Sequence, residues 1–287
     1  MTAVDRSAIS RELREVALRG RRYTYREVGA GEPLLLFHGW SGSSENFSAW
    51  LPALTPRFRV LIPDLPGCAG APALDETHTA AAYASFAHEF AQALELGSFA
   101  VGGLCSGASI AMALAATHPD DVNALLLHTP FFHPSVIRPT MRAQLALLGS
   151  PAGALYDVLR RNTLLSNTYR RFTDGGGVAT EEELRNQRNL AVADSRAQRQ
   201  LALDLARGDH RELLRSWRKP LFIVVADADA FILIAPFRAK LAEVAPNARV
   251  AVIPGGHGWT PAYLEHQARA LGAFAEEEGS RPPPETI

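Results

Sequence analysis

Short apolar runs recur along the chain, and stretches with helical spacing separate most of them. Residues 14–29 read as two strands joined by a turn at Gly20, which predicts a β-hairpin. The later apolar runs are too short for helices and predict buried strands at 33–39, 58–67, 98–104, 122–130, 220–229 and 248–256. Helical spacing predicts helices at 79–96, 106–119, 235–245 and 261–278. Strands alternating with helices predict an α/β fold with a mostly parallel sheet and helices on both faces.

This alternation stops between residues 134 and 216. The segment is rich in arginine, favours helices, contains no convincing strand and is interrupted by DGGG at 174–177. We predict a helical insertion into one α/β domain, whose two parts are residues 1–133 and 217–278. The tail, residues 279–287, contains three consecutive prolines and is predicted to be disordered.

Composition excludes several function classes. Of the 287 residues, 47% are hydrophobic, and the formal net charge is −1 with both signs interspersed, so neither nucleic acid nor an anionic membrane surface is an expected partner. No apolar run approaches the ~20 residues that span a bilayer, and the first residues lack a signal-peptide pattern. The two cysteines, Cys68 and Cys105, form no CxxC pair, so no metal or other cofactor is expected. We therefore expect a cytoplasmic protein with reduced thiols.

The most informative motif is GLCSG, at residues 103–107, between a predicted strand and a predicted helix. A residue at so sharp a turn is strained, and its neighbours two before and two after must be small, as Gly103 and Gly107 are. Cys105 is then expected at the carboxyl edge of the sheet, where the following helix N-terminus favours the thiolate. Ser106 is a poorer centre for the turn, because residue 104 is leucine. The alternative is a glycine-rich turn that binds phosphate or nothing, although the usual phosphate-loop spacings are missing.

A second motif, FHGWSGS at 37–43, follows a predicted strand. Its glycine lets the backbone turn, so that the N–H groups of Trp40 and Ser106 can form an oxyanion hole. The side chain of His38 is expected to support this loop.

Two later strands end in groups that complete an active site. In VVADADAFI, at 224–232, Asp229 is the better candidate to orient a histidine, and Asp227 is expected to form a turn. In IPGGHGWTP, at 253–261, His257 lies in a glycine-rich loop that suits a general base. The predicted catalytic residues, in chain order, are Cys105, Asp229 and His257.

With these motifs the chain resembles the α/β-hydrolase superfamily over about residues 12–278. DLPGCAG at 64–70 is similar to a further motif of that family, and the order nucleophile, acid, base is the family's order. The resemblance implies that residues 134–216 form a lid that covers the site and selects the substrate. The chain departs from the family pattern twice, with Cys105 in place of the usual serine and Cys68 in place of a usual histidine.

A cysteine nucleophile changes the expected substrates. Its thioester exchanges well, which favours thioesters, activated esters and lactones over amides and plain alkyl esters. Cysteine-type thioesterases and cyclases are similar in this respect, as are dienelactone hydrolases in the nucleophile alone. We expect a small-molecule acyl substrate, free or as a carrier-bound thioester, that is hydrolysed or released as a ring. The residues expected to contact it are Trp40, Leu104, His128, Phe131, Phe132, Phe231 and Trp259.

Other interpretations remain open. The arginines of the insertion either bind a carboxylate or phosphopantetheine, or form a solvated face; they include Arg138, Arg142, Arg160, Arg161, Arg170 and Arg171. A cofactor-independent lyase, isomerase or cyclase would use His257 as its base and survive replacement of Cys105. A non-catalytic binding protein would not need the complete triad spacing. A serine-to-cysteine change engineered to trap an acyl-enzyme would leave the same site. The oligomeric state is not predicted.

Overall fold

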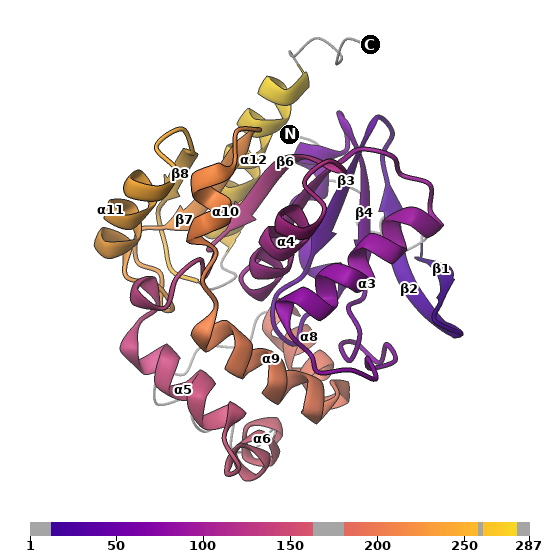
Figure 1. Ribbon diagram of the computed structural model, residues 1–287, viewed down its shortest axis with the longest axis vertical. Helices are drawn as coiled ribbons and strands as arrows, with labels where there is room; N and C mark the ends of the chain where they lie inside the picture. Colours follow the sequence, from indigo (N-terminus) through magenta and orange to yellow (C-terminus); the bar gives the residue numbers. More distant parts are fainter. Residues whose placement is uncertain (1–12, 163–180, 258–260, 280–287) are drawn as a thin grey trace.

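The computed structural model describes residues 13–162, 181–257 and 261–279 (Figure 1). A sheet of eight strands forms its centre, with the order β1-β2-β4-β3-β5-β6-β7-β8. The strands are β1 (Leu13–Leu18), β2 (Arg21–Val28), β3 (Glu32–Phe37), β4 (Phe58–Pro63), β5 (Phe99–Leu104), β6 (Val122–His128), β7 (Leu221–Ala226) and β8 (Arg249–Ile253). Only the pairs β1–β2 and β2–β4 are antiparallel. The prediction of a mostly parallel α/β sheet is confirmed.

The strands agree with the predicted ranges to within a few residues, except at some carboxyl ends. Strands β4, β7 and β8 end three or more residues earlier than predicted. Beyond these strand ends, residues such as Asp64, Asp227 and Gly255 lie in loops. These loops lie at the edge of the sheet where parallel strands place ligand sites.

Helices cover both faces of the sheet. Helix α3 (Ala80–Ala93) begins at Thr79, whose hydroxyl caps the Ala82 N–H at 3.1 Å. Its aromatic rings pack edge-to-face on β2, as Phe86 does on Tyr23. Helix α4 (Ser106–Thr117) packs beside α3 and is buried over most of its length, which explains its alanine-rich sequence.

The other face is covered by α12 (Pro261–Gly279) and the short α2 (Leu51–Leu54). Phe274 of α12 stacks between Phe58 of β4 and Phe222 of β7. Helix α11 (Ile234–Val244) lies between β7 and β8 in the chain, as predicted. Helix α2 and the 3₁₀ turns η1 (Ser44–Phe47) and η2 (Pro134–Val136) were not predicted, because three or four residues are too few for a periodic signal.

The described part of residues 134–216 is mainly helical. Its described helices between residues 139 and 207 gather at one end of the molecule, whereas the helix at residues 211–216 lies beside α4 and α11 (Figure 1). After η2 come α5 (Pro139–Gly149), α6 (Gly153–Arg161), α8 (Glu181–Val192), α9 (Ser195–Arg207) and α10 (Arg211–Ser216). Leu145 of α5 and Leu201 of α9 are buried where these two helices pack. The DGGG sequence and the tail from residue 280 lie outside the described residues. Among the helices that are described, none combines the length and apolarity needed to cross a membrane.

Candidate active site

Cys105 occupies a strained turn between β5 and α4. Its backbone angles are φ 55° and ψ −110°, which few residues other than glycine adopt. A Cβ on Gly103 would lie 2.1 Å from the carbonyl carbon of Gly107, and one on Gly107 would lie 2.0 Å from the oxygen of Phe37. Both glycines are therefore required for the turn to close.

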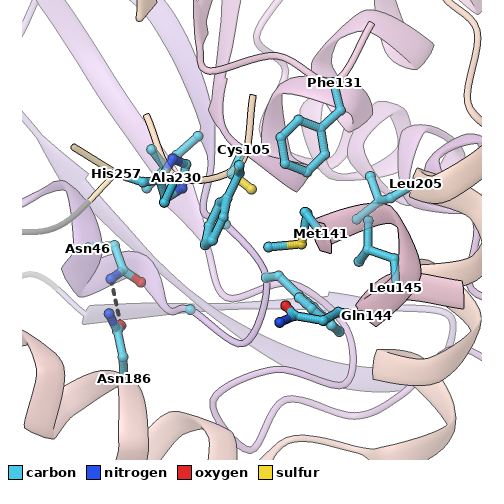
Figure 2. A pocket seen from close by; sticks show the side chains of 15 residues that line it. Asn46, Cys105, Phe131, Met141, Gln144, Leu145, Asn186, Leu205, Ala230 and His257 are labelled. Carbon is cyan, nitrogen blue, oxygen red and sulfur yellow. Dashed lines mark hydrogen bonds between the residues drawn. The ribbon is translucent and has the colours of Figure 1, made fainter. Parts of the chain in front are cut away.

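The turn presents the Cys105 side chain to a cavity. Its sulfur points into the space beside Phe131 and Met141 (Figure 2). The Cys105 N–H donates to the oxygen of His128 at 2.9 Å, so the backbone is fixed on the neighbouring strand. Ser106 is the first residue of α4, and the N–H of a first helical residue has no acceptor within its helix.

Asp229 and His257 come together beside this thiol. His257 Nδ1 lies 2.8 Å from Asp229 Oδ2, although the two residues are 28 positions apart. Asp229 is fully buried, and its other oxygen, Oδ1, accepts hydrogen bonds from the N–H groups of Phe231 and Ile232. Thr129 donates its hydroxyl to Oδ2 at 3.2 Å. The carboxylate is thus held by four donors from three loops.

The electrostatics follow from this arrangement. Burial lowers the pKa of His257, but the hydrogen bond to Asp229 and the hydrogen bond and charge of Cys105 together raise it to about 9. Burial by itself raises the pKa of Asp229, but the hydrogen bond and charge of His257, with the two backbone donors, bring it below its ordinary value. The site therefore favours an ionised carboxylate beside a protonated imidazole.

The loop with the predicted oxyanion donor is held by His38. Its Nδ1 lies 2.9 Å from the oxygen of Gly39, and its Nε2 accepts the N–H of Leu65 at 3.0 Å. Burial lowers the pKa of His38, which keeps the ring neutral as these two bonds require. Trp40 follows directly and lines the cavity.

His128 does not line the cavity, in contrast to our expectation. It is buried behind the site, where its Nε2 lies 2.7 Å from the amide nitrogen of Gln267. The side-chain oxygen of Gln267 accepts a hydrogen bond from the indole N–H of Trp50 at 2.8 Å. Burial and the charge of His257 lower the pKa of His128 to about 3, so the ring is a neutral acceptor at physiological pH.

The cavity has a volume of about 570 Å³, which is ample for a small organic substrate. Of the residues predicted to contact the substrate, Trp40, Leu104, Phe131 and Phe231 line it. Phe132 does not, because its neighbour Phe131 takes the inward position and Phe132 packs on Phe237 of α11 at 5.2 Å. Trp259 lies outside the described residues.

Sequence reasoning missed the wall that the helical segment contributes. Helices α5, α8 and α9 supply Met141, Gln144, Leu145, Asn186 and Leu205 to the cavity. Asn46 of η1 also lines it and donates its side-chain amide to the oxygen of Asn186 at 3.0 Å (Figure 2). The apolar members could have been found only by knowing which face of each helix turns inward. Thr129 was missed because a threonine after a strand carries no motif.

Two of the arginines considered as ligands for a substrate anion contact other groups of the protein. Arg138 donates to the backbone oxygen of Asp229, and Arg161 pairs with Asp157. Neither these nor Arg142 is among the lining residues. Arg170 and Arg171 lie outside the described residues, as does the side chain of Arg160.

Cys68 is separate from the cavity. Both cysteines are free thiols, so the structure contains no Cys68–Cys105 disulfide. Cys68 is buried, and Gln198 donates to its sulfur at 3.5 Å. Burial raises the pKa of the Cys68 thiol to about 12, which makes it unreactive.

The comparisons with known proteins identify the family. A family model described as the alpha/beta hydrolase fold matches residues 32–259, which is most of the chain. The chain therefore belongs to the α/β-hydrolase family, and it is an enzyme of that family. The family resemblance read from the motifs is confirmed.

Two relatives match over most of their length. The chain is 29% identical over 247 residues to "Putative carbamate hydrolase RutD" of Caulobacter sp. (strain K31), covering 82% of this chain and 89% of that protein. It is 31% identical over 230 residues to a pimeloyl-[acyl-carrier protein] methyl ester esterase of Aromatoleum aromaticum, covering 76% and 87%. The match to Lipase 1 of Psychrobacter immobilis, 35% identical, spans 43% of this chain and 40% of the lipase.

Solved structures share the fold. E-2-(acetamidomethylene)succinate hydrolase superimposes with a TM-score of 0.72 at 22% identity, covering 92% of this chain and 98% of that one. The N-acyl homoserine lactonase AidH, complexed with N-butanoyl homoserine, gives 0.72 at 20% identity, covering 94% and 98%. At these identities the likeness concerns the fold alone.

Proposed function

We propose that this protein is an acyl-transferring hydrolase that uses Cys105, His257 and Asp229 through a covalent thioester. The observation that carries the proposal is the position of Cys105: a side chain in a strained turn, facing a cavity, with a histidine–carboxylate pair beside it. A structural cysteine would need neither the strain nor the pair.

In the first half-reaction protonated His257 holds the proton of the thiol, and the Cys105 thiolate attacks the substrate's carbonyl carbon. The C–S bond forms while the C=O pair moves onto oxygen, which the N–H groups of Trp40 and Ser106 stabilise. The intermediate collapses, the bond to the leaving group breaks, and His257 returns the proton to that group. Asp229 keeps the imidazole oriented and stabilises its positive charge.

In the second half-reaction His257 removes a proton from water, and the hydroxide attacks the thioester carbon. The C–S bond breaks, the proton from water stays on His257 beside the Cys105 thiolate, and the product is a carboxylic acid. A hydroxyl or amine within the same substrate would replace water and give a ring. Helices α5, α8 and α9 act as the lid in this proposal, because their side chains bound the space that the acyl group occupies.

The lining of the cavity points to a substrate that is mainly apolar near the thiol. Leu104, Phe131, Phe231 and Met141 surround Cys105, whereas the amides of Asn46, Asn186 and Gln144 supply the polar contacts. Thioesters, activated esters and lactones of medium size, free or attached to a carrier, fit this surface. The names of the relatives, which include a carboxylic methyl ester esterase and a lipase, support acyl chemistry.

Steady-state turnover of a panel of acyl thioesters and activated aryl esters tests the proposal. Cys105→Ala should lower kcat/KM by at least ~10³-fold, and Cys68→Ala, the other buried thiol, should leave it within about threefold. If Cys105→Ala keeps full activity while His257→Gln abolishes it, the acyl-enzyme proposal is wrong and the enzyme is a lyase or isomerase with His257 as base.

A further inference from the structure

The loop that carries the proposed oxyanion donor contains a second strained residue. Trp40 and Ser41 are the two central residues of a tight turn. The Gly42 N–H closes this turn on the oxygen of Gly39 at 3.0 Å. Ser41 adopts a φ of 56°, in the left-handed region that glycine and asparagine favour at this position of such a turn. Serine keeps this conformation only where other contacts hold it, so the turn needs a support from outside.

That support comes from Gln198, a glutamine of α9 that lies 157 positions further along the chain. The Ser41 hydroxyl donates to Gln198 Oε1 at 2.5 Å, and both residues are buried. The amide nitrogen of Gln198 donates to the Cys68 sulfur at 3.5 Å, but sulfur is a weak acceptor. The strong side-chain hydrogen bond of this buried amide is therefore the one to Ser41.

The start of α9 is itself fixed on the core. The Asp194 N–H donates to the oxygen of Gly67 at 2.8 Å, and the Asp194 carboxylate caps the Ala197 N–H at 2.7 Å. Gln198 follows one turn later, and its N–H donates to the oxygen of Asp194 at 3.0 Å. The bond between Gln198 and Ser41 is buried, whereas those from α8 to the core are only partly buried. A buried hydrogen bond is shielded from water, so α9 can hold the turn firmly.

We propose that Gln198 is a positioning residue for the oxyanion hole. It holds Ser41 in its strained conformation and thereby keeps the N–H of the neighbouring Trp40 directed at the substrate's carbonyl oxygen. This inference rests on the proposed function, because it needs Trp40 to act as an oxyanion donor. Gln198 is not one of the described residues that line the cavity, so it acts only through the turn.

A positioning role predicts a particular kinetic change. The negative charge on the substrate's oxygen develops in the transition state, so a misplaced donor lowers kcat and leaves substrate binding nearly unchanged. Removing one oxyanion donor outright costs about 10²–10³-fold in kcat, and displacing one should cost less. We expect Gln198→Met, which keeps the size of the side chain and removes its amide, to lower kcat about 10–50-fold with KM within about threefold.

Gln200→Met is the matched control. Gln200 lies on the same helix, and its side-chain oxygen also accepts a backbone N–H of the core, that of His78, at 3.0 Å. This bond holds the segment before α3 and not the Trp40 turn, so kcat should stay within about twofold. Each rate is referred to the folded fraction of the protein, measured by circular dichroism, so that lost stability is not counted as lost catalysis.

Two variants of Ser41 test whether Gln198 acts through the strained turn. Ser41→Ala and Ser41→Gly both lack the hydroxyl, but glycine adopts a φ of 56° at no steric cost. Ser41→Ala should therefore lose about as much kcat as Gln198→Met, whereas Ser41→Gly should be about fivefold more active than Ser41→Ala. In the Ser41→Gly background, adding Gln198→Met should change kcat by no more than about twofold.

The outcomes separate this inference from the proposed function. Cys105→Ala is assayed beside these variants; if it keeps full activity, the proposed function is wrong and the inference with it. If Cys105→Ala is inactive while Gln198→Met loses no more kcat than Gln200→Met, the positioning role is overturned and the proposed function stands. Equal losses in Ser41→Ala and Ser41→Gly would also overturn it, because a bond that serves stability alone does not depend on the strain of the turn.

Discussion

The carboxyl edge of the sheet and the helical segment between β6 and β7 surround the same cavity but are built differently. At the edge, backbone holds the reactive groups: two glycines fix the Cys105 turn, and buried strands place the donors around Asp229. The helical segment instead leaves apolar side chains exposed, such as Leu155 at 67% and Val158 at 65%.

The contacts between α8 and the core show the same difference. Among the described residues, they include side-chain hydrogen bonds to η1 and the residue before it: Asn186 to Asn46, Asn189 to Ser43, and Arg185 to the backbone oxygen of Glu45. Such contacts are individually weak and exchange readily with water. Under the proposed function, the reacting groups are therefore fixed at the edge of the sheet, whereas the wall proposed to meet the substrate can change at small cost to stability.

The largest expected effect comes from filling the Cys105 turn. Gly103→Ala or Gly107→Ala places a Cβ within 2.1 Å of backbone, which should destabilise the fold by about 3 kcal/mol or more and abolish activity. Gly272→Ala is the matched control: it lies in α12 with nothing within 4 Å, and it should stabilise by about 0.5–1 kcal/mol. Urea unfolding of the three variants checks this. Equal stability of all three would show that the turn is not tightly constrained.

Neutralising the buried carboxylate should have the next largest effect. Asp229→Asn removes the charge that stabilises protonated His257 and should lower kcat/KM by about 10²–10⁴-fold. Asp227→Asn is the control, because this exposed carboxylate accepts the N–H of Gly255 at 3.0 Å and, among the described residues, makes no other hydrogen bond or ion pair with its side chain. Its kcat/KM should stay within about threefold of the unmodified enzyme. Similar losses in both variants would contradict the assignment of Asp229.

The two histidines of the edge should limit stability on opposite sides of neutrality. His257, with its pKa raised to about 9, binds a proton in the folded state that the unfolded chain releases above ~6.5. Its stabilisation is therefore complete below pH ~6.5 and is lost as the pH rises to about 9. His128, with its pKa lowered to about 3, must take up a proton on unfolding, so stability falls as the pH drops from ~6.5 toward 3.

Plotted against pH, the free energy of unfolding should therefore have an acid limb and an alkaline limb. Each limb should approach a slope of about 1.4 kcal/mol per pH unit. Urea midpoints between pH 4 and 10 measure it, and His257→Gln should flatten the alkaline limb. An unchanged alkaline limb would mean that the folded protein does not hold the extra proton on His257.

The smallest effect is expected in the helical segment. Asn186→Ala removes the bond to Asn46 and an amide from the cavity, which should raise KM about fivefold, the equivalent of one hydrogen bond, with little change in melting temperature. Val192→Ala, exposed at 60% on the same helix, should change neither. A large loss of stability in the Asn186 variant would show that this segment is as firmly built as the sheet.

The sequence predicts the sheet edge better than the helical segment, for a physical reason. Strand runs and glycine turns are local signals, so the positions of Cys105, Asp229 and His257 at strand ends could be inferred before their distances were known. Which face of α5 or α8 turns inward depends on packing, so the positions of Met141 and Asn186 in the cavity wall could not be inferred from the sequence. His128 was misplaced because a histidine at a strand end gives no sign of whether it faces a cavity or a buried amide.

The most direct test of the account is intact-protein mass spectrometry after rapid quenching with acyl thioesters and activated aryl esters. We predict a mass increase equal to the acyl group, located on the peptide that contains Cys105 and absent from Cys105→Ala protein. Substrates that turn over with no acyl adduct at any quench time, and at the same rate in the Cys105→Ala protein, would contradict covalent catalysis by Cys105.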